Sequence, residues 1–282
     1  MDQRRQRLYR TPAIVLKRQD FGEADRILTL FTPDVGKLRV IAKGVRKITS
    51  RKSGHVELFT YSHLLIAKGR NLDIVTQAET LQSFRAVRED LSRIMYAYYI
   101  AELVDQFTED RDENRRLFDL LLATLQALGE TDDVRRTTRF FELRFLEAVG
   151  YRPQLFRCVQ CNREIEPVDN FFGLEAGGVL CPDCIVGVPE RPRPELAEGP
   201  AIREGYAGYG ESPSPVRPLS LNALKVLRFM QREPYPAVEK LNIRRETHGE
   251  MERLMHRYLT HLLERDLKSV EFLGTLAVTS KQ

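Results

Sequence analysis

The chain has 282 residues, of which 42% are hydrophobic and 30% are charged, which is enough for two or three units with cores of their own. No stretch approaches the roughly 20 consecutive apolar residues of a membrane span, so we expect a soluble protein. The net charge of +4 conceals an asymmetry. Residues 1–85 contain seventeen Lys or Arg and eight Asp or Glu residues, a formal charge of +9, which leaves −5 for the rest. This predicts a polyanionic partner for the first domain.

Residues 1–82 are predicted to be β-structure. Five β-rich runs, separated by turn sequences such as PDVG and GRN, suggest a small closed or nearly closed barrel, and the small basic barrel to expect is an OB-fold. The runs are 11–18, 26–32, 37–44, 63–69 and 72–80.

The cations of this first domain gather in residues 37–52, which we call the basic segment. It contains no acidic residue, and the alternation in KLRVIAKG turns Leu38 and Val40 to one face and Lys37 and Arg39 to the other. Such a stripe can neutralise phosphates and release counterions, although many charge runs are only solvated loops. The predicted DNA contacts are Lys37, Arg39, Lys43, Arg46, Lys47, Arg51 and Lys52.

After residue 82 the apolar residues recur at helical spacing. Helices are expected over 83–107, starting at a Ser cap, and over 114–129 and 133–150, each ending at a glycine. Two more are expected, over 221–231 with Ser220 as its cap and within 244–268, and these would return to complete one bundle. Residues 187–219 are rich in Pro and Gly and are predicted to be a linker.

All four cysteines lie in one segment with the spacing C-x2-C-x19-C-x2-C. Cys158, Cys161, Cys181 and Cys184 would place four thiolates around one zinc ion, with a hairpin-like insert between the two pairs. The N-terminal sequence shows no apolar signal segment, so we expect a cytoplasmic protein with reduced thiols, which argues against two disulfides. Four sulfur ligands would leave no position for water, so the zinc is predicted to be structural.

A catalytic zinc site is the weaker alternative. Zinc deaminases combine H-x-E with P-C-x-x-C, and the chain contains His55-Val56-Glu57, but Leu180 precedes Cys181 and the second cysteine pair would be left over. We therefore predict that the protein is not an enzyme. A zinc-stabilised module that binds RNA or an acidic protein through the basic barrel stays open as another alternative.

These patterns together predict an α+β, multidomain architecture. Residues 1–82 would form the OB-fold barrel and DNA-binding domain, 83–155 with 220–282 the helical bundle, and 156–219 the zinc-binding insert and linker.

Four stretches of this sequence resemble the bacterial RecO family of recombination mediators. They are TPAIVLKRQDFGEADRILTLFTPDVGKLRVIAKGVRK at the start, ELRFLEAVGYRPQLFRCVQC, LCPDC, and SLNALKVLRFMQ near the end. The opening stretch is the most specific of them, because zinc knuckles occur in many unrelated proteins.

The resemblance implies an N-terminal OB-fold, a helical domain and, in some members, a four-cysteine zinc site. It implies binding of single- and double-stranded DNA, annealing of complementary strands, and loading of RecA onto strands coated by single-stranded-DNA-binding protein. It further implies contacts with RecR and with the C-terminal tail of single-stranded-DNA-binding protein, no covalent chemistry, and a cytoplasmic, nucleoid-associated protein.

Overall fold

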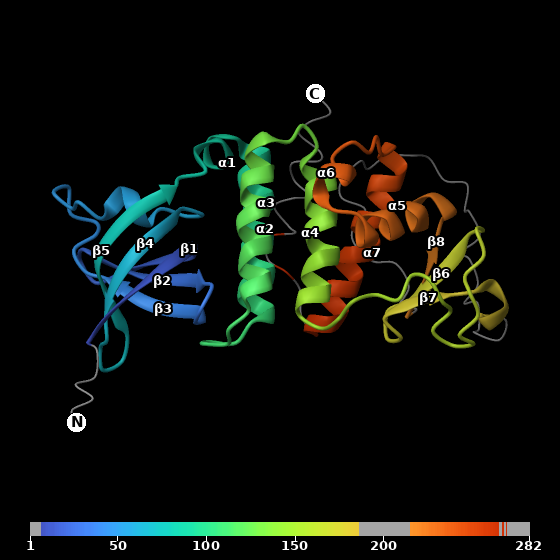
Figure 1. Cartoon of the computed structure of the whole chain (residues 1–282), viewed down its shortest axis with the longest axis horizontal. Coiled ribbons are helices and arrows are strands. Elements are labelled where there is room, and N and C mark those ends of the chain that lie inside the picture. Colours follow the sequence, from blue (N-terminus) through green and yellow to red (C-terminus); the bar gives the residue numbers. More distant parts are fainter. Residues whose placement is uncertain (1–6, 186–214, 265–266, 268, 270–282) are drawn as a thin grey trace, which may run out of the picture. The chain divides into compact units, whose positions relative to one another are not determined.

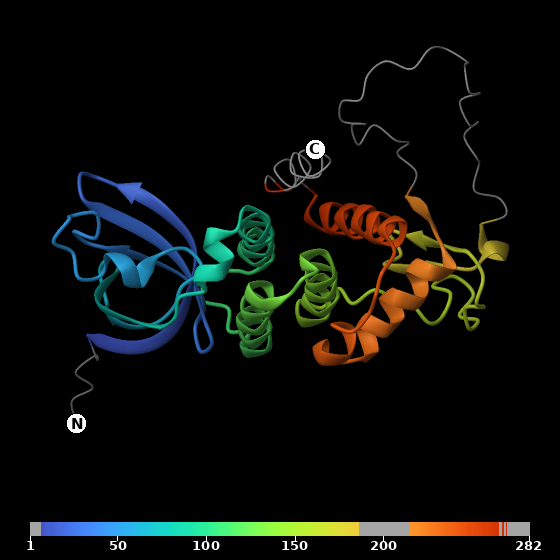
Figure 2. The ribbon, with the colours of Figure 1, turned by 90° about the horizontal axis from the view of Figure 1, so that it is seen from above.

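The computed structural model describes residues 7–185 and 215–264, together with Leu267 and Ser269. These residues form two compact units (Figures 1 and 2). Unit 1 comprises the described residues up to Tyr151 with Leu267 and Ser269, and unit 2 runs from Arg152 to Glu264. No helix in these described ranges is long and apolar enough to cross a membrane.

Unit 1 begins with five strands whose sheet closes on itself as a small barrel. The strands are β1 (Leu8–Phe21), β2 (Asp25–Thr32), β3 (Gly36–Ala42), β4 (Tyr61–Ala67) and β5 (Asp73–Gln82), with a 3-10 turn η1 (Ser53–Val56) before β4. Neighbours follow the order β1-β2-β3-β5-β4 and β4 pairs with β1 again; all pairs are antiparallel except β3 with β5. All five predicted strands are confirmed within a few residues at each end.

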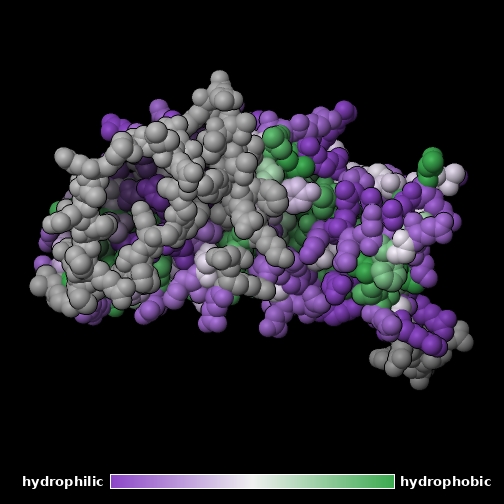
Figure 3. Space-filling view, turned by 180° about the vertical axis from the view of Figure 1, so that it is seen from behind, coloured by the Kyte–Doolittle hydropathy of each residue, from purple (hydrophilic) through white to green (hydrophobic). Residues whose placement is uncertain are grey.

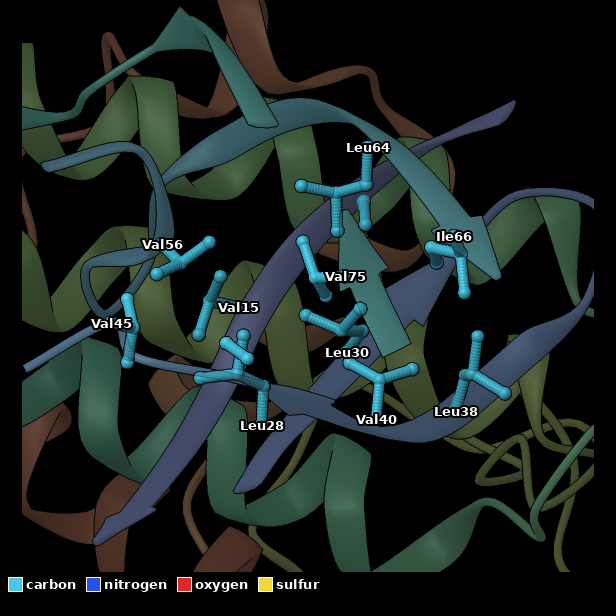
Figure 4. Packing of buried hydrophobic residues seen from close by; sticks show 12 residues of the cluster. Val15, Leu28, Leu30, Leu38, Val40, Val45, Val56, Leu64, Ile66 and Val75 are labelled. Atoms are coloured by element: carbon cyan, nitrogen blue, oxygen red, sulfur yellow. The ribbon is translucent and has the colours of Figure 1, made fainter. Parts of the chain in front are cut away.

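The barrel interior is filled by aliphatic side chains, which Figure 4 shows converging from all five strands. The predicted alternation along β3 is confirmed, because Leu38 and Val40 are buried in this core while Arg39 is exposed. Two further valines, Val45 and Val56, enter the same core from the connection between β3 and β4. That connection is therefore fixed to the barrel at both ends.

Four helices follow in unit 1. They are α1 (Arg85–Glu89), α2 (Leu91–Phe107), α3 (Arg115–Glu130) and α4 (Val134–Ala148). The first predicted helix is thus interrupted at Asp90, whose extended backbone ends α1 and whose carboxylate accepts the Arg93 N–H to cap α2. The predicted Ser cap at residue 83 is wrong, because α1 starts after Phe84 with no side-chain cap. Gly129 does not end α3, which continues to Glu130.

The barrel and the helices of unit 1 are joined where the start of β3 meets the end of α2 and the segment that follows it. The Lys37 ammonium donates to the backbone oxygens of Asp105 and Thr108, both at 2.6 Å, at the C-terminal end of α2. The Arg111 N–H donates to the Lys37 backbone oxygen at 2.8 Å. A cation here satisfies carbonyls that a helix end leaves without intrahelical partners.

Unit 2 contains a three-stranded sheet and three helices. Its elements are β6 (Asn170–Gly173), β7 (Gly178–Leu180), the 3-10 turn η2 (Pro182–Cys184), β8 (Val216–Leu219), α5 (Leu221–Arg232), α6 (Tyr235–Val238) and α7 (Arg245–Leu263). Strands β6 and β7 form the predicted hairpin, and the Ser220 hydroxyl caps α5 as predicted by accepting the Ala223 N–H.

The predicted linker ends earlier than expected. Residues 186–214 lie outside the described residues, but β8 pairs with β6 at the edge of the sheet in the order β7-β6-β8. Pro218 is compatible with this position, since an edge strand needs only half of its backbone hydrogen bonds.

Helices α5 and α7 group with the four-cysteine segment and not with α2–α4 as the predicted bundle had it. Their side chains show why. The buried Gln231 amide of α5 donates to the Pro153 oxygen at 2.8 Å, and Tyr258 of α7 packs edge-on against Phe172 of β6 with ring centroids 5.2 Å apart. These helices supply the apolar surface on which the small hairpin folds.

Candidate nucleic-acid interface and four-cysteine cluster

The basic segment runs along β3 and through the connection to β4. Within the described residues, four of the seven predicted contacts are exposed and have no hydrogen bond or ion pair from their side chains. They are Arg39, Lys43, Lys47 and Arg51. We call them the four exposed cations.

The other three predicted contacts have partners inside unit 1. Lys37 holds the end of α2 and lies 3.4 Å from a carboxylate oxygen of Asp105, with its side chain 11% exposed. The Lys52 ammonium donates to the Val75 backbone oxygen at 2.9 Å, and burial lowers its pKa. Arg46 lies 3.4 Å from an Asp20 carboxylate oxygen. The geometry thus separates structural cations from those available to a ligand, which charge alone could not do.

Two aromatic residues near the basic segment in sequence, Phe31 and Phe59, are not available to stack on bases. Phe31 and Phe59 are buried and pack against helix residues, Phe31 on Phe118 and Phe59 edge-on to Tyr98 with ring centroids 5.2 Å apart. They join the barrel to the helices. Hydrophilic residues cover most of the barrel face seen in Figure 3, with hydrophobic residues in smaller groups among them.

The four cysteines converge in unit 2 as predicted. Their sulfur atoms all lie within 4.8 Å of one another, and Cys161 Sγ is 3.7 Å from Cys181 Sγ. A disulfide would need about 2.05 Å, whereas Zn–S bonds of about 2.3 Å in a tetrahedron separate the sulfurs by about 3.8 Å. The cluster could therefore hold a metal ion, and its four soft sulfur donors suit zinc.

Local backbone geometry builds each half of the cluster. After Cys161 the chain turns back through Asn162, whose φ of 58° is in the left-handed region that Asn tolerates, and the Asn162 N–H donates to the Cys158 oxygen at 2.9 Å. The second pair flanks the turn η2, since Cys181 precedes it and Cys184 ends it, and the Cys184 N–H donates to the Cys181 oxygen at 3.1 Å. The Cys181 N–H also points to Cys158 Sγ at 3.4 Å, which links the two halves.

Arg163 contacts the four-cysteine cluster, which the cysteine spacing did not reveal. Its guanidinium donates to Cys161 Sγ at 3.4 Å and to a carboxylate oxygen of Asp183 at 2.8 Å. The hydrogen bond from Arg163 lowers the pKa of Cys161 to about 6. Hydrogen bonding to Cys181 raises the pKa of Cys184 to about 12. The thiols cannot all ionise together without a cation among them, and Arg163 supplies part of that positive charge.

A cavity of about 840 Å³ lies in unit 1 between β1 and α2. Apolar side chains of Leu16, Leu58 and Met95 line it, but its charged groups balance as three cations and three carboxylates. The cations are Lys17, Arg18 and Arg26, and the carboxylates are Asp20, Glu102 and Asp105. Its charge gives no preference for an acidic ligand.

Comparison with known proteins assigns both parts of the chain to one family. Residues 6–84 match the family model described as recombination protein O N terminal, and residues 88–204 and 205–271 match recombination protein O C terminal. The DNA repair protein RecO of Roseiflexus sp. (strain RS-1) is 45% identical over 269 residues, covering 95% of this chain and 86% of that protein. The DNA repair protein RecO of Dehalococcoides mccartyi (strain ATCC BAA-2266) is 36% identical, covering 95% and 96%, and that of Pelotomaculum thermopropionicum is 36% identical, covering 95% and 94%. The chain therefore belongs to the RecO family of DNA repair and recombination proteins.

Proposed function

We propose that this protein binds single- and double-stranded DNA through the four exposed cations of the basic segment and anneals complementary strands. The observation that carries the proposal is that an acid-free stretch of chain presents Arg39, Lys43, Lys47 and Arg51 outward without partners among the described residues. Annealing needs two strands held close with their mutual phosphate repulsion reduced. Mobile, salt-sensitive phosphate contacts achieve that without reading bases.

We propose that the barrel is an OB-fold. The support is its five strands, their order β1-β2-β3-β5-β4 and the parallel β3–β5 pair that this order requires. In this proposal the protein acts without a catalytic centre, in the cytoplasm at the nucleoid. It helps RecR to load RecA onto strands coated by single-stranded-DNA-binding protein, as the family resemblance implies.

The proposal is tested by changing the four exposed cations together to Ala and measuring binding of a labelled single-stranded oligonucleotide across a salt series. Each lost phosphate contact lowers the slope of log affinity against log salt by about 0.7, so the slope should fall by up to about 3. Double-stranded DNA should show a parallel loss, and strand annealing should slow.

A matched control removes the same charge from unit 2, where Lys225, Lys240, Arg245 and Arg253 are exposed cations. If this control variant loses as much slope as the first, attraction is due to net charge and not to the basic segment. Stronger binding of an RNA oligonucleotide of the same sequence would favour an RNA-binding module instead.

We propose further that Cys158, Cys161, Cys181 and Cys184 hold a structural zinc ion. Four thiolates around Zn²⁺ leave a net charge of −2, which the Arg163 guanidinium partly balances from outside. The bound ion would connect the β6–β7 hairpin to the segment before it and would supply folding free energy, with no open position for chemistry.

Replacing Arg163 with Ala should therefore weaken zinc retention by about tenfold, at the low end of what loss of an outer-shell partner costs a metal site. The measurement is the equilibrium transfer of zinc to a chromogenic chelator. Arg157→Ala is the matched control, because the Arg157 guanidinium donates to the Asn162 oxygen at 3.1 Å beside the same turn without contacting a sulfur. Equal retention by the two variants would show that the Arg163 contact contributes nothing to the metal site.

A further inference from the structure

The most exposed large hydrophobic residue in the described ranges is Ile48, which lies in the basic segment between β3 and η1. Its relative exposure is 106%, whereas the next, Leu91 of α2, has 64%. Two of the four exposed cations, Lys47 and Arg51, lie one and three residues away from it. An aliphatic side chain wholly in water gains free energy from any apolar surface that covers it.

The chain around Ile48 is held in place by the barrel. The Gly44 N–H donates to an Asp25 carboxylate oxygen at 2.7 Å, and the Arg46 N–H donates to the Ala24 backbone oxygen at 2.9 Å. Beyond Ile48, the Ser50 N–H closes a turn on the Lys47 oxygen at 2.9 Å. Val45 is buried in the barrel core on one side and Val56 on the other. Ile48 is thus presented outward by an ordered turn, so little conformational entropy is lost when a ligand covers it.

We propose that Ile48 packs against unstacked nucleobases of a single strand whose phosphates lie on the neighbouring cations, and that it favours single-stranded over double-stranded DNA. This rests on the proposed DNA binding and assigns to one residue the contact that depends on unpaired bases. Apolar side chains insert between bases when positive groups hold the backbone beside them. In a single strand the bases separate at little cost, whereas a duplex must unstack a base-pair step before a side chain can enter.

The surroundings of Ile48 favour a nucleic acid over a protein partner. The basic segment has no acid over sixteen residues, and one isoleucine offers far less apolar area than the several hundred Å² per partner of a stable protein interface. Bases supply flat apolar faces at the spacing of a phosphate chain, which suits one apolar side chain between several cations.

The test compares the full-length protein with Ile48→Ala, Ile48→Leu and Lys47→Ala for binding to single-stranded and double-stranded oligonucleotides across a salt series. Ile48→Ala should weaken single-strand binding about fivefold, as expected for partial burial of one aliphatic side chain. Its salt slope and its duplex affinity should not change. Ile48→Leu should restore most of the single-strand affinity, and Lys47→Ala should weaken both ligands and lower the slope.

A 2-aminopurine base in the single strand supplies a second readout, because its fluorescence rises when it is unstacked. The parent protein should raise this fluorescence and Ile48→Ala should not. Unchanged single-strand affinity of Ile48→Ala, or equal losses on both ligands, overturns the role of Ile48 while leaving the cation contacts in place. Failure of the parent protein to bind either ligand overturns the proposed DNA binding and this inference together.

Discussion

Replacing Cys158 with Ser is expected to abolish stoichiometric zinc binding and to unfold the hairpin segment of unit 2. Cys158 is 2% exposed, and its sulfur is the acceptor that joins the two cysteine pairs through the Cys181 N–H. A serine hydroxyl is a poor zinc ligand at neutral pH. In such sites the free energy of binding the ion is also folding free energy, of order 10 kcal/mol in small zinc peptides. A unit that cannot bind the ion therefore loses most of its stability.

The measurements are zinc content after dialysis and differential scanning calorimetry of the parent and the variant. The parent treated with a strong chelator should reproduce the variant's calorimetric profile. Cys161→His is the matched control, since Cys161 is exposed and an imidazole can take the place of a thiolate as a ligand. A Cys158→Ser protein that keeps one zinc ion and an unchanged profile would exclude the proposed four-sulfur site.

Replacing Gly36 with Ala is expected to destabilise unit 1 by about 3 kcal/mol or more. Gly36 has φ of 71°, and a Cβ placed there would lie 1.7 Å from the Asp112 backbone oxygen. The left-handed conformation alone costs a residue with a Cβ about 1–2 kcal/mol. Relief of the overlap would push the segment between α2 and α3 away from β3, and with it the carbonyls that Lys37 holds.

Gly22→Ala is the matched control for that variant. Gly22 has φ of 57° but nothing lies within 4 Å of a Cβ at this position, so only the conformational cost of about 1–2 kcal/mol applies. Urea denaturation followed by circular dichroism and tyrosine fluorescence measures both, since the chain has ten tyrosines and no tryptophan. Equal losses of unfolding free energy in the two variants would show that the close approach to Asp112 does not affect stability.

Much of the fold and the four-cysteine cluster could be predicted from the sequence, because their signals are local. The alternation in KLRVIAKG placed Leu38 and Val40 inside the barrel, since successive side chains of a strand point to opposite faces. The C-x2-C spacing brought each cysteine pair together through one tight turn, and Ser220 had a free N–H three residues ahead to cap. The acid-free run from 37 to 52 needed only composition.

Other features depended on contacts between residues far apart in the chain. Lys37 and Lys52 resemble Lys43 and Lys47 in sequence, but their ammonium groups donate hydrogen bonds to backbone oxygens 68 and 23 residues away. Asp90 interrupts the first helix, and helices α5 and α7 group with the four-cysteine segment because Gln231 and Tyr258 find their partners there.

The sequence by itself therefore determined the five barrel strands, most of the helices, the cysteine cluster and the location of positive charge. Only the tertiary structure decided which cations remain free for a ligand, that Arg163 completes the surroundings of the cysteines, and that Ile48 stands wholly in water. The physical reason is that periodicity and spacing fix what a short segment does with its own backbone. Whether a charged or apolar side chain is satisfied inside the protein depends on which distant groups the fold brings within a few ångströms of it.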